Sequence, residues 1–285
     1  MLDQAKKLRE MASTRGLIKK TKIITITSGK GGVGKSNIVV NLGIALQKMG
    51  NKVMIFDADI GMGNDDILLG FLPKYNVFDI MLKDMALQDV LMECPFGMKL
   101  LLAGPGTSKI EKVTEEQKDK FLNKLKALED LDFILIDTGA GINRTVLALI
   151  ASSDEVVVVT TPEPTSLTDA YGLVKAINHF KLKTETSVII NKVLEYKEGE
   201  VTYNKFKNAV NSFLKMKTKH LGTIFEDKDV IRAVKSQEPF AISYPNSIAT
   251  KDIFLIAEYI NDSTKEAPKG TGAEELAKKI FNIFS

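Results

Sequence analysis

The sequence predicts an α/β fold, in which a doubly wound, mainly parallel sheet of seven to eight strands is flanked by helices. Short runs rich in valine and isoleucine alternate with longer segments of helical period along most of the chain. Most of these runs are apolar nearly throughout, as parallel strands buried on both faces must be. Composition shows neither a repeat nor a break between residues 21 and 260, so we expect a single domain there.

The individual elements follow from these patterns in chain order. The predicted strands are 22–27, 52–57, 99–103, 133–137, 155–161, 187–191 and 221–225. The helix-length segments between them include 37–49, 115–128, 167–180 and 203–216. Because such alternation implies right-handed crossover connections, helices should cover both faces of the sheet.

The two flanks of this domain differ from its body. Residues 1–20 are charged and are predicted to form a helical extension, without the apolar core of a secretory signal. Residues 261–272 are polar and predict a linker, which leads to a short helical segment at 273–285. About 18 consecutive apolar residues occur nowhere, so we expect the chain to act in the cytoplasm or at a membrane surface.

Charge and cysteine content restrict the function further. The net charge of +3 gives no support to direct nucleic-acid binding. Cys94 is the single cysteine, so no internal disulfide can form, and this fits a reducing compartment.

The strongest local pattern is a glycine-rich stretch directly after the first predicted strand. It matches Gly-x-x-x-x-Gly-Lys-Ser/Thr and precedes a predicted helix, the context in which such a loop cradles phosphates with its backbone N–H groups. In this pattern Lys35 reaches the terminal phosphates, and the Ser36 hydroxyl is a Mg²⁺ ligand. The sequence therefore predicts ATP binding and hydrolysis. The residues predicted to hold ATP or ADP here are Gly29, Lys30, Gly31, Gly32, Val33, Gly34, Lys35, Ser36 and Asn37.

Acidic residues follow two of the predicted strands. Asp57 and Asp59 end the second strand segment, and Asp137 ends the fourth. Carboxylates at the carboxyl ends of parallel strands lie in the crevice where doubly wound folds bind ligands. We expect Asp137 to hold Mg²⁺ through water and residues 139–141 to form a mobile segment near the terminal phosphate. Taken alone, either acid could instead cap a helix.

The loop contains a second lysine, Lys30, and its Lys-Gly-Gly-Val-Gly-Lys-Ser sequence resembles the deviant phosphate loop of the MinD/ParA class of dimerising ATPases. The resemblance implies that Lys30 reaches the nucleotide of a facing subunit and that Asp59 orients the attacking water. The catalytic residues are then Lys30, Lys35, Asp59 and Asp137, and the Mg²⁺ site is Ser36, Asp59 and Asp137. The residues implied to face the partner subunit of an ATP-dependent homodimer are Lys30, Asn64, Glu163 and Asp169. Those implied to contact adenine are Asn191, Phe225, Glu226 and Asp227, where Phe225 replaces the usual proline.

The first residues resemble a more specific group. Asp-Gln-Ala-Lys-Lys-Leu-Arg at residues 3–9 is similar to the Asp-Gln-Ala-x-x-Leu-Arg tail of the flagellar number regulators known as FlhG, YlxH or FleN. In that group the tail stimulates FlhF, a GTPase of the signal-recognition-particle type, and the regulators also contact flagellar switch-ring proteins. The residues implied to activate an FlhF-type GTPase are Asp3, Gln4, Ala5, Leu8 and Arg9. The alternative is that residues 1–20 form an amphipathic helix that only caps the domain and activates no partner.

The last segment combines bulky apolar residues with lysines on a predicted helix. Such a helix can lie in the headgroup region of an anionic membrane surface, and two copies in a dimer would bind far better than one. The residues predicted to bind the membrane are Leu276, Lys278, Lys279, Ile280, Phe281, Ile283 and Phe284. Packing of this helix back onto the domain is the alternative.

Three other functions share parts of this pattern. A regulator of cell-division site placement shares the ATPase and the membrane helix, but does not explain the N-terminal tail. A DNA-segregating ATPase would need a basic surface on the dimer. Metal-cluster carriers need paired cysteines on the dimer axis, which a lone Cys94 argues against.

Overall fold

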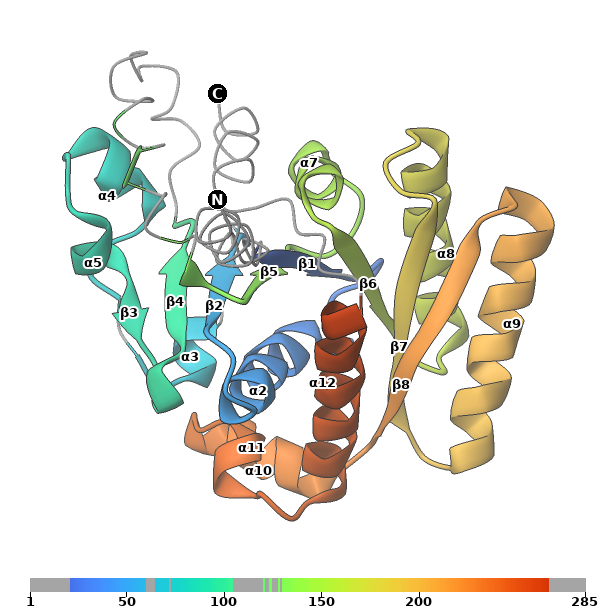
Figure 1. The fold of residues 1–285 in the computed structure, drawn as a ribbon. Coiled ribbons are helices and arrows are strands. Elements are labelled where there is room, and N and C mark those ends of the chain that lie inside the picture. The colour runs from blue at the N-terminus through green and yellow to red at the C-terminus, as the bar shows by residue number, and fades with distance from the viewer. Residues whose placement is uncertain are drawn as a thin grey trace, which may run out of the picture.

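The computed structural model describes residues 21–59, 65–71, 73–104, 120, 123–124, 128 and 130–266, with the side chains of residues 81, 265 and 266 excepted. In this part of the chain an eight-stranded sheet is covered by helices on both faces (Figure 1). The predicted α/β fold class is therefore confirmed. Residues 1–20 and 273–285, which carry the predicted activator and membrane segments, lie outside the described residues, as does Asn64.

The strands are joined in a mostly parallel order. They are β1 (Lys22–Thr27), β2 (Val53–Asp57), β3 (Met92–Glu93), β4 (Lys99–Leu102), β5 (Phe133–Asp137), β6 (Glu155–Thr160), β7 (Glu185–Val193) and β8 (Lys217–Phe225). The order across the sheet is β3-β4-β2-β5-β1-β6-β7-β8, and β3–β4 is the antiparallel pair. All of the predicted strands are present, while β3 was not predicted, because a strand of 2 residues is too short to show a period.

The predicted helices 37–49, 167–180 and 203–216 begin earlier in the structure than their sequence pattern indicated, at residues 35, 164 and 196. The helices of the described residues are α2 (Lys35–Lys48), α3 (Asp65–Leu68), α4 (Val77–Leu82), α5 (Leu87–Val90), the 3₁₀ turn η1 (Pro95–Gly97), α7 (Arg144–Ser152), α8 (Pro164–His179), α9 (Tyr196–Leu214), α10 (Lys228–Ser236), α11 (Phe240–Ser243) and α12 (Ile248–Glu266). Most of the predicted helix 115–128 lies outside the described residues. None of the helices described is long and apolar enough to cross a membrane.

The predicted boundary between domain and linker at residue 260 is wrong. Helix α12 continues to Glu266, so residues 261–266 of the predicted linker are helical. The hydroxyls of Ser263 and Thr264 each donate to the carbonyl of Ile260 at 2.8 Å. Polar residues that bond back to the preceding turn remain compatible with a helix.

The core forms two layers because successive strand residues point to opposite faces. Ile24 and Ile55 pack on the face covered by α2, α10, α11 and α12. Ile23 and Met54, one residue earlier in each strand, pack on the other face. That second face is covered by α4 and α5 near β2 and β4, and by α7, α8 and α9 near β6–β8 (Figure 1).

Strand order determines where a ligand site can form. β1 lies between β5 and β6, so the chain winds away from it in both directions. Loops that leave neighbouring carboxyl ends at such a switch point diverge and leave a crevice. The loop after β1 opens into this crevice, and Asp57 of β2 pairs in register with Asp137 of β5 beside it. The predicted phosphate loop and acids therefore meet at one edge of the sheet.

Candidate functional site

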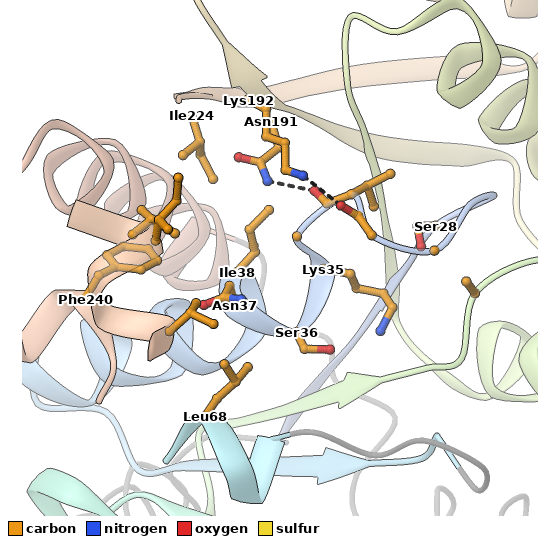
Figure 2. A pocket seen from close by; sticks show the side chains of 18 of the residues that line it. Ser28, Lys35, Ser36, Asn37, Ile38, Leu68, Asn191, Lys192, Ile224 and Phe240 are labelled. Atoms are coloured by element: carbon orange, nitrogen blue, oxygen red, sulfur yellow. Dashed lines mark hydrogen bonds between the residues drawn. The ribbon is translucent and has the colours of Figure 1, made fainter. Parts of the chain in front are cut away.

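A cavity of about 1030 Å³ opens at the carboxyl ends of the central strands (Figure 2). One side is the loop of residues 29–36 with the start of α2, and Asp59 and Gly139 lie at the acidic end. Residues that follow β7 and β8, together with α10, close the other side. Nucleotide-sized ligands occupy pockets of about 300–1,000 Å³, so the volume accommodates a nucleoside triphosphate.

Glycines give the loop its shape. Gly34 has φ +89, a left-handed conformation that disfavours other residues, and a Cβ there would lie 2.3 Å from Asn191 Nδ2. A Cβ at Gly29 would lie 2.2 Å from the backbone carbonyl of Asp169. Cβ atoms at Gly31 and Gly32, by contrast, would meet nothing within 4 Å. The loop is thus packed at both ends and open in its middle, where a phosphate can approach the backbone.

Two side chains from the end of β7 hold the loop in place. Asn191 Nδ2 donates to the carbonyl of Val33 at 2.7 Å, and Lys192 Nζ donates to the carbonyl of Gly32 at 2.8 Å (Figure 2). Asn191, for which the resemblance implies an adenine contact, lines the cavity with its amide bonded to the phosphate loop. Lys192 was not predicted, although its position directly after Asn191 at a strand end was an available signal.

Lys35 points toward the acids at the sheet edge. Its ammonium donates to Asp137 Oδ1, and both side chains are buried. The pairing satisfies Asp137 and places the lysine beside the phosphate loop. Ser36, at the first turn of α2, also lines the cavity.

Asp57 and Asp65 complete a buried acidic cluster with Asp137. One ligand oxygen from each residue lies within 4.8 Å of the others. Burial and the nearby charge of Asp137 raise the pKa of Asp57 to about 7. Burial, followed by the charges of Asp137 and Asp57, raises the pKa of Asp65 well above its usual value. The sequence predicted a metal role for Ser36, Asp59 and Asp137, and gave none to Asp57 or Asp65.

Asp59 occupies a different position from these three acids. Its backbone N–H donates to Asp57 Oδ1 at 3.0 Å. Its half-buried carboxylate lies at the cavity wall, where a Cβ on Gly139 would be 3.4 Å from Asp59 Oδ1. The predicted catalytic acid thus faces the predicted mobile segment at 139–141.

Lys30 lies on the outer side of the loop. Its Nζ is 3.1 Å from Glu163 Oε2 and 3.1 Å from Thr165 Oγ1, both at the start of α8. The Lys30 side chain is 40% exposed and that of Glu163 63%. Asp169 is exposed on the same helix, and its backbone packs on Gly29. The predicted partner-facing residues Lys30, Glu163 and Asp169 therefore form one patch.

The predicted adenine residues line the far wall of the cavity. Phe225 is half-buried and its N–H donates to Asp252 Oδ2 at 3.0 Å, while Glu226 is exposed. Asp227 caps α10, since its Oδ1 accepts from the N–H of Asp229 at 2.9 Å. An apolar part of this wall was not predicted, because its residues are far apart in the chain and appear as ordinary core positions. It is formed by Ile67, Leu68, Ile224, Val230, Ile231, Val234 and Phe240.

The donor chemistry fits a nucleotide with Mg²⁺. Open backbone at Gly31 and Gly32 suits phosphate, and Lys35 supplies a cation next to it. Hydroxyl and carboxylate oxygens from Ser36 and Asp137 are the ligand type that Mg²⁺ prefers.

Comparison with known sequences gives consistent relatives. A ParA family model described as NUBPL iron-transfer P-loop NTPase matches residues 19–261. The flagellum site-determining protein YlxH of Helicobacter pylori is 38% identical over 266 residues, which cover 93% of this chain and 88% of that protein. The antiactivator FleN of Pseudomonas aeruginosa is 34% identical over 247 residues, covering 86% and 88% respectively.

A solved structure supports the same fold. The septum site-determining protein MinD from Pyrococcus horikoshii, complexed with Mg-ADP, superimposes with a TM-score of 0.66 at 27% identity. The match covers 86% of this chain and 97% of that one.

Proposed function

Because the chain belongs to the MinD/ParA family of P-loop ATPases, in the group that contains YlxH and FleN, we propose that it cycles between a monomer and an ATP-bound homodimer that regulates the number and placement of flagella. The single observation that supports the dimer is that the two lysines of the phosphate loop lie in different places. Lys35 is buried and faces the acids of its own site, whereas Lys30 lies at the exposed rim. A rim lysine can contact a nucleotide bound by a second copy.

The reaction we propose is hydrolysis of ATP to ADP and phosphate. The polyphosphate competes with Asp137 for Lys35, so that lysine moves from a carboxylate to a phosphate oxygen. Asp59 accepts a hydrogen bond from the attacking water and orients it, which its place opposite Gly139 at the cavity wall supports. Ser36 and Asp137 would hold Mg²⁺, partly through water, and the bound ion would neutralise charge that develops on the phosphates.

Lys30 provides the test of the shared site. In an Asp59→Ala background, which slows turnover and lets ATP-bound complexes accumulate, we expect a dimer by light scattering with Mg-ATP. Adding Lys30→Ala should abolish the dimer but retain ATP binding, because Lys30 does not face its own cavity. Lys175→Ala, an exposed lysine on α8, is the matched control and should leave the dimer intact. A dimer that persists without Lys30 would refute the shared site.

The flagellar role rests on the named relatives and on the N-terminal segment. YlxH is described as site-determining for the flagellum and FleN as an antiactivator. We propose that residues 3–9 stimulate an FlhF-type GTPase and that residues 273–285 bind the dimer to an anionic membrane, so the protein moves between cytoplasm and membrane. A peptide of residues 1–20 should raise the GTPase rate of FlhF, and Gln4→Ala should reduce that effect. An unchanged rate would favour a cell-division role, since the segment would then have no flagellar partner.

Iron transfer, which the matching family description names, finds no support in the cysteine of this chain. Cys94 is buried, and burial raises the pKa of its thiol to about 12. A cysteine binds a metal as its thiolate, the form that this burial disfavours. We therefore assign Cys94 to the core.

A further inference from the structure

The buried acids at the sheet edge come from three separate parts of the chain. Asp57 ends β2, Asp65 begins α3 and Asp137 ends β5. Each is at most 1% exposed, and their nearest oxygens lie within 4.8 Å of one another. The proposed magnesium ligands of the nucleotide complex include Asp137 but not Asp65.

Asp65 is the unusual member of this cluster. It is fully buried, and neither of its carboxylate oxygens accepts a hydrogen bond from a described residue. Its own N–H donates to Asp57 Oδ2 at 3.4 Å, which directs the residue into the cluster. The oxygens of Asp65 also approach those of Asp137, and a hydrogen bond between the two groups needs a proton on one of them, because ionised carboxylates only accept. A buried polar group without a partner is rare in native proteins and needs an explanation, one of which is a bound ion.

The charges of the cluster are also unbalanced. Lys35 is the cation that contacts it among the described residues, through Asp137. When all three carboxylates are ionised, they and the one ammonium leave two negative charges, a state that burial disfavours and that either protons or one divalent cation would neutralise. Carboxylate oxygens are the ligands that Mg²⁺ and Mn²⁺ prefer. Three ligands of one such octahedral ion are about 3.0–4.2 Å apart, so the three oxygens, which lie within 4.8 Å of one another, would move closer together on binding one.

We propose that Asp57, Asp65 and Asp137 form a divalent-cation site that is filled before nucleotide enters, and that the buried Asp65 carboxylate binds the ion directly. This goes beyond the proposed function, in which Mg²⁺ is held by Ser36 and Asp137 in the nucleotide complex. The ion would occupy the floor of the cavity beside Lys35, which stays available to contact phosphate when nucleotide enters.

The test uses the full chain, freed of nucleotide and treated with a chelator. Mn²⁺ is added, and the free ion is measured by electron paramagnetic resonance. We expect one Mn²⁺ per chain, displaced by excess Mg²⁺. Asp65→Asn, which keeps the shape of the side chain, should raise the dissociation constant about tenfold or more. Asp66→Asn changes the next, half-exposed carboxylate and should leave binding unchanged.

Two results would overturn the proposal. One is equal Mn²⁺ affinity of the wild-type and Asp65→Asn chains. The other is a wild-type melting temperature that does not rise when Mn²⁺ is added in the absence of nucleotide. That result is expected if protons, and not a metal ion, neutralise the cluster. The second measurement needs no variant, so it holds even if Asp65→Asn folds poorly. Because no nucleotide is present, either outcome leaves the proposed ATPase and dimer cycle untouched.

Discussion

Replacing Gly34 with alanine should damage the phosphate loop more than an equivalent change at Gly50. Both glycines have left-handed backbones, with φ +89 and φ +87. A Cβ at Gly50 meets nothing within 4 Å, whereas one at Gly34 would lie 2.3 Å from Asn191 Nδ2. Gly50→Ala therefore introduces backbone strain alone, and Gly34→Ala introduces the same strain with a clash.

The expected magnitudes follow from these two terms. An alanine in the left-handed region costs about 1–2 kcal/mol. Alanine also lowers the conformational entropy of the unfolded chain, which offsets about 0.5–1 kcal/mol of this cost in both variants. The clash at Gly34 must move the buried Asn191 amide and break its 2.7 Å bond to the Val33 carbonyl. That loss adds about 1 kcal/mol, so Gly34→Ala should be less stable than Gly50→Ala by at least this amount.

Urea unfolding of both variants, with and without Asn191→Ala, measures the difference. In the double-mutant cycle, Gly34→Ala should cost less once the Asn191 amide is gone, because no clash remains. ATP binding should weaken in Gly34→Ala and remain normal in Gly50→Ala. Equal destabilisation of the two single variants, with no coupling to Asn191, would refute the packing of Asn191 against Gly34.

Three further changes test other parts of the protein. Asp59→Ala should lower ATP turnover about 100-fold or more in a phosphate-release assay while ATP binding persists, and normal turnover would exclude its proposed role. Removal of residues 273–285 should abolish sedimentation with anionic vesicles and spare ATP binding; continued sedimentation would place the anchor elsewhere. Burial raises the pKa of Glu155, but Lys22 at 2.8 Å and a hydrogen bond from Ser187 hold it below its usual value overall. Glu155→Gln should therefore lower the free energy of unfolding by about 1–2 kcal/mol at neutral pH, and the difference should vanish as the pH falls through the lowered pKa; a loss that stays constant with pH would rule out the ion pair as its cause.

Local patterns were enough for the fold class and the phosphate loop. Strand residues 22–27 and 133–137 were predicted with the bounds they have in the structure, because buried parallel strands are continuous apolar runs. The loop from Gly29 to Ser36 was identified because all its functional groups are adjacent in the chain. Local patterns failed where tertiary packing decides the outcome. α12 extends through polar residues to Glu266, and β3 exists because it pairs with β4.

The sequence by itself determined which chemical groups this protein has for binding and hydrolysing a nucleotide. The tertiary structure decided which of them meet. Lys30 and Glu163 are 133 residues apart, and Lys192 and Gly32 are 160 apart, yet each pair is in contact. Asp65 has no visible role in the sequence and becomes part of the site only when α3 places it beside Asp57 and Asp137. Such contacts between distant residues depend on strand order and register, which are set by the packing of the whole sheet and not by residues adjacent in the chain.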